Sequence, residues 1–213
     1  MNVHSFTFNL FSENTYILTD NHSKQCVIID PGCSNYYEQN ILMDFIQNQQ
    51  LKPVLLLNTH CHIDHVFGNQ WVKDTFNIPF YAHQKEIDNL HKLPMYAPMF
   101  GIPPFHSPFP DKYIDEKDTI TFSKTTLTIL FTPGHSVGSI CFYHADSHQI
   151  ISGDVLFNGS IGRYDLPGGN FYTLIESIKT KLLTLPNQTT VYSGHGPATT
   201  IGHERYNNPF LIS

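Results

Sequence analysis

Hydrophobic residues recur along the chain with the spacings of short strands and amphipathic helices. Near the N-terminus, alternating or β-branched runs at 6–10, 15–19 and 25–29 predict three strands, the first two joined by a turn at 12–14. Apolar residues three and four positions apart then predict a helix over 36–50. This part of the chain is therefore expected to form a strand meander followed by a helix.

The same alternation continues to the end of the chain. Further strands are predicted at 54–57, 78–82, 119–122, 127–131, 139–144, 149–152 and 190–192. Further helices are predicted at 68–77, 83–90 and 171–185. Strands grouped between helices in both halves predict an α+β protein, with sheet packed on sheet and helices outside, in a single domain spanning residues 1–213.

One segment, 93–110, does not follow either pattern. It contains six prolines, two methionines and several aromatic residues. Proline removes backbone donors and breaks helices, so the segment is expected to be irregular. Its aromatic residues leave two interpretations open, a loop laid over the core or a lid on the substrate side of a site.

Composition narrows the functional classes. Twelve Lys and Arg face 18 Asp and Glu, a formal net charge of −6, which argues against a nucleic-acid surface. No secretory leader or membrane-length apolar run is present, so a cytoplasmic protein without membrane association is expected. The cysteines form no C-x-x-C pair and are expected to be reduced, with Cys61 serving packing. The oligomeric state is left open.

The densest cluster of metal-binding residue types is His60-x-His62-x-Asp64-His65, directly after the strand at 54–57. With this composition, such a pattern is expected by chance in roughly 0.003 of shuffled chains. At an extended strand end, His60 and His62 project to the same side. A following helical turn would swing Asp64 and His65 toward a second point, which predicts two metal ions.

In the second half, three strands end in a donor beside a glycine: Gly134-His135, Gly153-Asp154 and Gly194-His195. Glycine permits sharp turns and close backbone approach, so these loops are expected to converge on one site. Imidazole and carboxylate donors without a thiolate suit zinc first, with iron or manganese as alternatives, in an open catalytic site. The remaining histidines are interpreted as surface or core residues: His4, His22, His83, His91, His106, His144, His148 and His203.

These motifs, in this order, resemble the metallo-β-lactamase superfamily over essentially the whole chain. The resemblance implies an αββα four-layer sandwich. It implies one ion held by His60, His62 and His135, and a second held by Asp64, His65 and His195. Asp154 and a hydroxide would bridge the two ions.

Within the superfamily, residues 156–165 and the ending Gly194-His195-Gly196-Pro197 with Asn208-Pro209-Phe210 resemble the compact hydroxyacylglutathione hydrolase group, the type II glyoxalases. The resemblance implies hydrolysis of a small thioester such as S-lactoylglutathione by the bridging hydroxide, oriented by Asp64 as the catalytic carboxylate. A thiolate leaving group, with a pKa near 8.5, needs little acid assistance. The chain departs from the group at Tyr164, where many relatives have threonine, and no separate C-terminal helical domain is expected.

Three residues carry further hypotheses. Arg163 and Tyr164 are expected to bind substrate, Arg163 through an anionic group of the thiol carrier; the alternative for Arg163 is an ion pair with Asp165. Asp30 is either an acceptor that orients a ligand histidine or a turn aspartate before proline.

Other functions remain as alternatives: a persulfide dioxygenase with a single iron, or a non-enzymatic metal-stabilised module. A β-lactamase is less favoured because Asp154 stands where those enzymes carry other residues, and the charge balance disfavours a nuclease.

Overall fold

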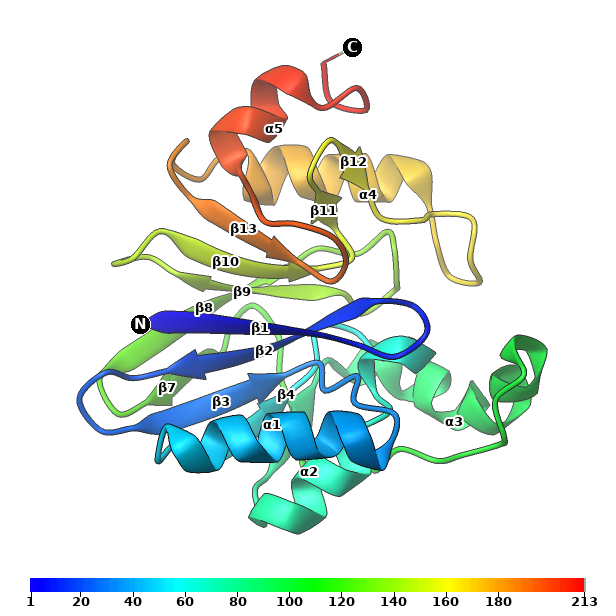
Figure 1. The fold of residues 1–213 in the computed structure, drawn as a ribbon. Helices are drawn as coiled ribbons and strands as arrows, with labels where there is room; N and C mark the ends of the chain where they lie inside the picture. The colour runs from blue at the N-terminus through cyan, green and yellow to red at the C-terminus, as the bar shows by residue number, and fades with distance from the viewer. Residues whose placement is uncertain (213) are drawn as a thin grey trace. The chain divides into compact units, whose positions relative to one another are not determined.

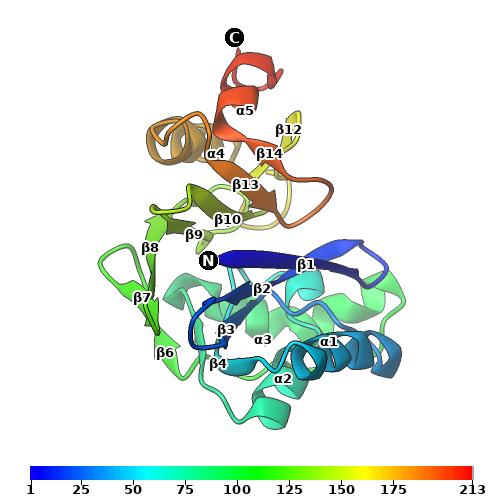
Figure 2. The ribbon, with the colours of Figure 1, turned by 60° about the vertical axis from the view of Figure 1, so that its left-hand side comes forward.

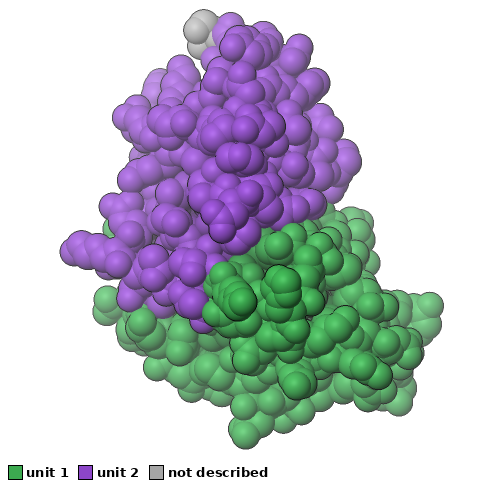
Figure 3. All heavy atoms as spheres, turned by 90° about the vertical axis from the view of Figure 1, so that its left-hand side faces the viewer, with its two compact units in different colours: residues 1–113, 122–125 green, residues 114–121, 126–213 purple. Residues whose placement is uncertain are grey.

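The computed structural model describes residues 1–212 and divides the chain into two compact units (Figure 3). Unit 1 comprises residues 1–113 and 122–125, and unit 2 comprises residues 114–121 and the chain from 126 onward. Within the described residues, one six-stranded sheet belongs mainly to each unit (Figure 1). The predicted mixture of sheets and helices is therefore observed in both units.

The sheet of unit 1 has the strand order β1-β2-β3-β4-β5-β6. Its strands are β1 (Asn2–Phe8), β2 (Glu13–Thr19), β3 (Gln25–Ile29), β4 (Lys52–Leu57), β5 (Phe80–Ala82) and β6 (Lys112–Tyr113). The first three strands are antiparallel, and β3, β4, β5 and β6 are parallel neighbours. Parallel strands need a crossover, which α1 (Tyr36–Asn48) and α2 (Asn69–Phe76) supply before and after β4.

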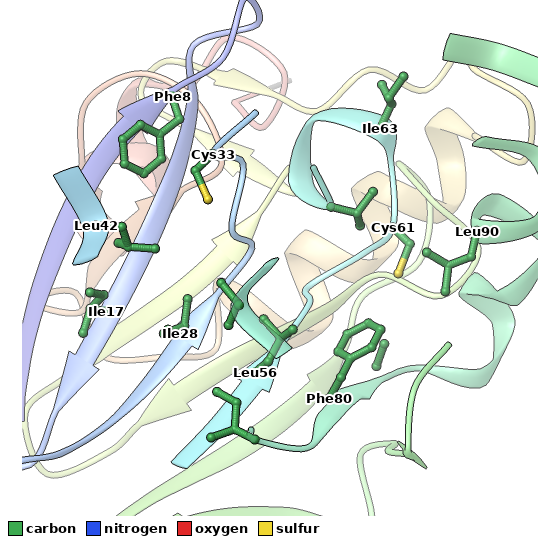
Figure 4. Close-up of a cluster of buried hydrophobic side chains, with 14 of the residues drawn as sticks. Phe8, Ile17, Ile28, Cys33, Leu42, Leu56, Cys61, Ile63, Phe80 and Leu90 are labelled. Atoms are coloured by element: carbon green, nitrogen blue, oxygen red, sulfur yellow. The ribbon is translucent and has the colours of Figure 1, made fainter. Parts of the chain in front are cut away.

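The core of unit 1 lies between these helices and the sheet (Figure 4). Ile17, Ile28 and Leu56 on the strands are fully buried together with Leu42 of α1. Burying one such side chain contributes about 1.5–3 kcal/mol. Cys61 lies in the same cluster, and burial raises the pKa of its thiol well above the ordinary value. The expected packing role of Cys61 is confirmed.

The sheet of unit 2 has the order β14-β13-β10-β9-β8-β7. Its strands are β7 (Thr119–Phe122), β8 (Thr125–Phe131), β9 (Ile140–His144), β10 (Gln149–Gly153), β13 (Thr190–Ser193) and β14 (Thr199–Thr200). The helix α4 (Phe171–Ser177; labelled in Figure 2) continues into a π-helical turn, η4 (Ile178–Leu182). Leu174 and Leu182 of these two segments are buried in one cluster with Val191 of β13. The predicted helix over 171–185 thus ends earlier and changes its hydrogen-bond pattern at Ile178.

The prediction that 93–110 is irregular is wrong for its first part. Helix α3 (Ile87–Tyr96) runs through Pro94, and a 3-10 helix, η3 (Ala97–Phe100), follows it directly. Leu90, Leu93 and Ala97 recur at helical spacing and are buried in the core of unit 1. Their packing outweighs the penalty of about 3 kcal/mol for a proline inside a helix. The remainder, residues 101–110, is irregular as expected.

The first turn is also displaced from its predicted position. It lies at Asn9–Ser12, where Asn9 and Ser12 have φ angles of 53° and 56°, and the backbone N–H of Phe11 donates to Asn9 Oδ1 at 2.9 Å. Asparagine tolerates the left-handed region better than most residues. Glu13, placed in the turn by its polarity, instead begins β2 and is fully buried.

Several short elements in unit 2 were not predicted: the hairpin of β11 (Leu156–Phe157) and β12 (Ser160–Ile161), the strand β14, and helix α5 (Ile201–Asn207). Within α5, the buried residues are Ile201 and Glu204, so no apolar period marks the helix. Within residues 1–212, no helix combines the length and apolar character needed to cross a membrane.

Asp20 stabilises the turn after β2 and provides a pH-dependent term in stability. Asp20 Oδ1 accepts hydrogen bonds from the backbone N–H of Ser23 (2.9 Å) and of His22 (3.1 Å), and Oδ2 accepts from Thr125 Oγ1 (3.2 Å). These bonds, chiefly the one from the Ser23 backbone, lower the pKa of Asp20.

Because the folded pKa lies below the unfolded value of about 3.9, this stabilisation is present above that pH and is lost as the pH falls through the folded pKa. We expect Asp20→Asn to lower the urea midpoint at pH 6, with the difference from wild type shrinking toward pH 2. A difference that stays constant across this range would contradict the assignment.

Candidate metal site

In unit 1, the chain after β4 gathers three imidazoles. His60 and His65 are buried, and the His60 ring centroid lies 4.7 Å from that of His62 and 4.1 Å from that of His65. A 3-10 helix, η1 (Ile63–His65), turns the chain here, and His65 Nε2 lies 3.7 Å from Asp64 Oδ2. The helical turn that was expected to redirect Asp64 and His65 is present.

Asp30, at the end of β3, anchors this cluster. Its Oδ1 accepts from the backbone N–H of Thr59 at 2.7 Å and from Asn58 Nδ2 at 3.1 Å. Its Oδ2 accepts from Thr59 Oγ1 at 2.6 Å and lies 3.1 Å from His65 Nδ1. A carboxylate only accepts, so His65 carries its proton on Nδ1 and presents Nε2 as a ligand atom.

Thr59 determines in the same way which ring nitrogen of His60 carries the proton. The Thr59 hydroxyl donates its hydrogen bond to Asp30, so its oxygen, 3.1 Å from His60 Nδ1, accepts a hydrogen bond from the N–H of that nitrogen. His60 therefore also presents Nε2. Ligand atoms of Asp30, His60 and His65 lie within 4.8 Å of one another. Both oxygens of Asp30 are already engaged by donors, and through them the aspartate holds His65 directly and His60 by way of Thr59.

Two more residues fix the backbone of the histidine loop. Asn9 Nδ2 donates to the carbonyl of Asp64 at 3.0 Å, which ties the β1–β2 turn to the backbone of the histidine loop. Glu86 is buried, and its Oε2 accepts from the backbone N–H of Cys61 at 2.8 Å, between His60 and His62. Neither residue was identified from the sequence. Only the Asn9 position carried a local signal, as a turn-forming asparagine.

Glu13 adds a third carboxyl group, after Asp30 and Asp64, beside the unit 1 histidines. It is fully buried, and its Oε1 lies 3.9 Å from His65 Nδ1. Burial raises the pKa of the Glu13 carboxyl well above its ordinary value; His65 opposes this rise, and Asp30 and Asp64 add to it. Buried carboxylates that disfavour one another's charge are stabilised by a cation, so this donor set fits a divalent ion.

In unit 2, the donors that follow β8, β10 and β13 also come together. Asp154 Oδ2 lies 3.5 Å from His135 Nε2 and 3.4 Å from His195 Nε2. Two ligands bound at 2.0–2.1 Å to a tetrahedral ion are separated by about 3.3 Å. His135 Nδ1 lies 2.7 Å from the carbonyl oxygen of Arg163, so this imidazole also directs Nε2 toward Asp154. The spacing fits a carboxylate oxygen that shares an ion with each histidine.

The glycines beside these donors differ in their roles. Gly134 has φ = 132°, and a Cβ there would lie 2.3 Å from the backbone nitrogen of Leu174. Gly153 has φ = 50°. The predicted need for glycine therefore holds before His135 and Asp154. At the third loop, the positive φ of 71° falls on Gly196, after His195.

The two residues expected to bind substrate lie beyond the Asp154 loop. The Arg163 guanidinium forms a two-bond pair with Asp165, at 3.0 Å and 2.9 Å, and both side chains are exposed. Tyr164 is 40% exposed and packs edge-on against Phe171. The ion-pair alternative for Arg163 is thus the arrangement observed, while its carbonyl orients His135.

Comparisons with known proteins identify the family. The model of the metallo-β-lactamase superfamily matches residues 9–195. The chain is 42% identical to the probable metallo-hydrolase YqgX of Bacillus subtilis, over 93% of this chain and 92% of that protein. It is 36% identical to the hydroxyacylglutathione hydrolase GloC of Haemophilus influenzae, over 100% of this chain and 99% of that protein.

Solved structures agree with this match. BLEG-1, a B3 metallo-β-lactamase, superposes with a TM-score of 0.89 at 38% identity and 100% coverage of both chains. TTHA1623 in a di-iron-bound form gives 0.87 at 36% identity, over 98% of this chain and 100% of that one. ETHE1 from Myxococcus xanthus gives 0.81 over 98% of this chain and 84% of that one, and at 22% identity it shows the fold alone.

The chain belongs to the metallo-β-lactamase superfamily of metal-dependent hydrolases. The predicted α+β class and metallo-β-lactamase fold are confirmed. This fold, with its clusters of histidine and aspartate, indicates a divalent-metal site.

Proposed function

We propose that this hydrolase cleaves a hydroxyacyl thioester such as S-lactoylglutathione at a centre of two divalent ions. His60, His62 and His135 would hold one ion, Asp64, His65 and His195 the other, and Asp154 both. Zinc is the proposed metal, with iron or manganese as alternatives.

The observation that carries this proposal is that three imidazoles are held in the same way, with Nδ1 bonded and Nε2 left to bind a metal. His60, His65 and His135 each have Nδ1 engaged with an oxygen acceptor, which leaves Nε2 for coordination. Asp154 Oδ2 lies at ligand spacing from Nε2 of His135 and from Nε2 of His195. The full-length similarity to GloC supports a hydroxyacylglutathione-type substrate, and the di-iron form of TTHA1623 keeps iron open.

The chemistry divides between the ions and the chain. When bound, two divalent ions lower the pKa of water toward about 7 and polarise a carbonyl group. The Asp64 carboxylate would accept a hydrogen bond from the attacking water and direct its lone pair at the carbonyl carbon. The thiolate leaving group departs without a general acid. The main role of the chain is therefore to position the metal-binding side chains, with little general acid-base catalysis.

A second candidate is hydrolysis of a β-lactam. It is supported by the 38% identity with BLEG-1 over the whole chain. A strained amide needs a proton on its departing nitrogen, whereas a thioester does not. Cleavage of a β-lactam would therefore require a proton donor at the site that cleavage of a thioester does not.

One preparation can decide among these activities. The purified chain would be assayed for metal content, then for turnover of S-lactoylglutathione, other hydroxyacyl thioesters and a chromogenic β-lactam, with oxygen uptake on glutathione persulfide as a further arm. Close to two ions per chain and a preference for a thioester are expected. A single tightly bound iron with oxygen uptake, or a preference for the β-lactam, would overturn the proposal.

Arg163→Ala is expected to raise KM for an anionic thioester by about 10- to 150-fold with unchanged metal content, because a charge-assisted hydrogen bond to the carrier is lost. The exposed pair with Asp165 adds little to stability, so Arg163 can exchange it for a substrate carboxylate at small cost. Asp165→Asn is the matched control and should not raise KM. Equal losses on anionic and neutral thioesters would contradict this role.

A further inference from the structure

We propose that Glu204 and Asn208, at the C-terminal end of unit 2, form a clamp that positions the metal donors Asp154 and His135. The inference rests on the metal centre of the proposed function and gives a role to the Asn208-Pro209-Phe210 motif. Both clamp residues are fully buried, and neither belongs to the proposed ligand set.

The clamped element is the β11–β12 hairpin. It pairs only Leu156 with Ile161 and Phe157 with Ser160. Isolated two-stranded hairpins are marginally stable even when longer than this one. The hairpin therefore depends on contacts with the rest of unit 2 for a fixed position.

Both ends of the hairpin lead to proposed metal donors. Asp154 lies two residues before β11, and Arg163, whose carbonyl accepts from His135 Nδ1 at 2.7 Å, lies two residues after β12. The ends are held together, since the backbone N–H of Gly162 donates to the Val155 carbonyl at 3.3 Å. A Cβ at Gly162 would lie 1.8 Å from the Asp154 carbonyl oxygen. A shift of the hairpin therefore moves the Asp154 carboxylate and the group that orients His135.

The clamp residues hydrogen-bond to the turn at the tip of this hairpin. Glu204 Oε2 accepts from the backbone N–H of Gly159 at 3.0 Å. Asn208 Nδ2 donates to the Ser160 carbonyl at 2.9 Å and to Glu204 Oε2 at 2.7 Å.

The two clamp residues are fixed in turn by their own neighbours. Glu204 Oε1 accepts from Thr199 Oγ1 at 2.5 Å, and Asn208 Oδ1 accepts from the backbone N–H of Phe210 at 3.0 Å. Helix α5 and the Asn-Pro-Phe turn thus hydrogen-bond to the Gly159–Ser160 turn through two side chains that are themselves held in place.

A matched control exists on the same helix. Arg205 fastens α5 to another segment: its Nη1 donates to Asn187 Oδ1 at 2.5 Å and its Nη2 donates to the Leu185 carbonyl at 3.2 Å. Arg205→Ala therefore loosens α5 without removing a bond to the hairpin. It separates loss of the helix anchor from loss of the clamp.

The test uses Asn208→Ala, Glu204→Met and Arg205→Ala in the full chain, with zinc affinity measured by chelator competition. The two clamp variants are expected to bind zinc about 10- to 100-fold more weakly, as when residues that support metal ligands are changed. Arg205→Ala should lower the melting temperature and keep wild-type zinc affinity. Glu204→Met keeps a similar side-chain length and removes both acceptor oxygens, so it serves if Asn208→Ala does not fold.

A second readout needs no metal or substrate. Amide hydrogen exchange of the metal-free protein should rise at least about tenfold at Gly159 and Gly162, whose N–H groups are bonded to Glu204 and Val155, in the clamp variants, and not in Arg205→Ala. The proposal is overturned if the clamp variants keep wild-type zinc affinity and hairpin protection. It is also overturned if Arg205→Ala weakens zinc binding equally. Neither readout uses a thioester, so failure of the proposed substrate leaves this result distinct.

Discussion

Replacing Asp154 with alanine is expected to lower hydrolytic activity about a thousandfold, because metal-dependent stabilisation of a transition state amounts to several kcal/mol. In unit 2, Asp154 Oδ2 is the atom that lies at ligand spacing from both His135 and His195. The variant should also release metal during dialysis against chelator, while its far-UV circular dichroism stays that of wild type.

Asp146→Ala is the control for this substitution. Asp146 is an exposed carboxylate in the turn between β9 and β10 of the same unit, so it tests the loss of one negative charge far from the donors. It should keep metal and activity. If Asp154→Ala retained two ions per chain and near-normal turnover, the shared-carboxylate assignment would be wrong.

Asp30→Asn is expected to weaken metal binding about 10- to 100-fold and to destabilise the metal-free protein by about 1–3 kcal/mol. The new amide nitrogen cannot accept, so it faces at least one of the donors now held by the carboxylate, from Thr59 or from His65. Without that acceptor, the proton of His65 is no longer fixed on Nδ1. Through Thr59, the same holds for the proton of His60.

Asp20→Asn distinguishes the two effects. Asp20 is another buried carboxylate of unit 1 that closes a turn after a strand, but its donors are backbone and hydroxyl groups. This variant should lose stability at neutral pH with unchanged metal affinity, measured by chelator competition. Wild-type metal affinity in Asp30→Asn would show that the carboxylate does not orient the histidines.

Much of the fold could be predicted from the sequence, and the proposed donors were chosen from it, because their signals are local. The apolar period around Leu42 marks α1, and a histidine two positions from another marks a strand end. The helix break expected at Pro94 failed because Leu90, Leu93 and Ala97 bury a common face. Proline rules describe the backbone alone, and the packing energy that overrides them belongs to the tertiary structure.

The supporting residues could not be predicted for a related reason. Glu86 contacts Cys61 across 25 positions of sequence, and Glu204 contacts Gly159 across 45. No periodicity reports such pairs, and a buried glutamate has the same local pattern as an exposed one. Thr59 is the exception. Its hydroxyl is adjacent to His60 in the sequence, and this position could have suggested a hydrogen bond between Asp30 and the histidine through Thr59.

The shared anchor at Asp30 has a thermodynamic consequence for the proposed centre. One carboxylate holds His65 directly and His60 through Thr59, and these histidines are assigned to different ions. An ion that orders one imidazole stabilises the same carboxylate geometry on which the other depends. The two binding events are then linked, and by reciprocity each ion raises the affinity for the other equally. A chain of this design would pass from empty to doubly loaded over a narrow range of free metal concentration.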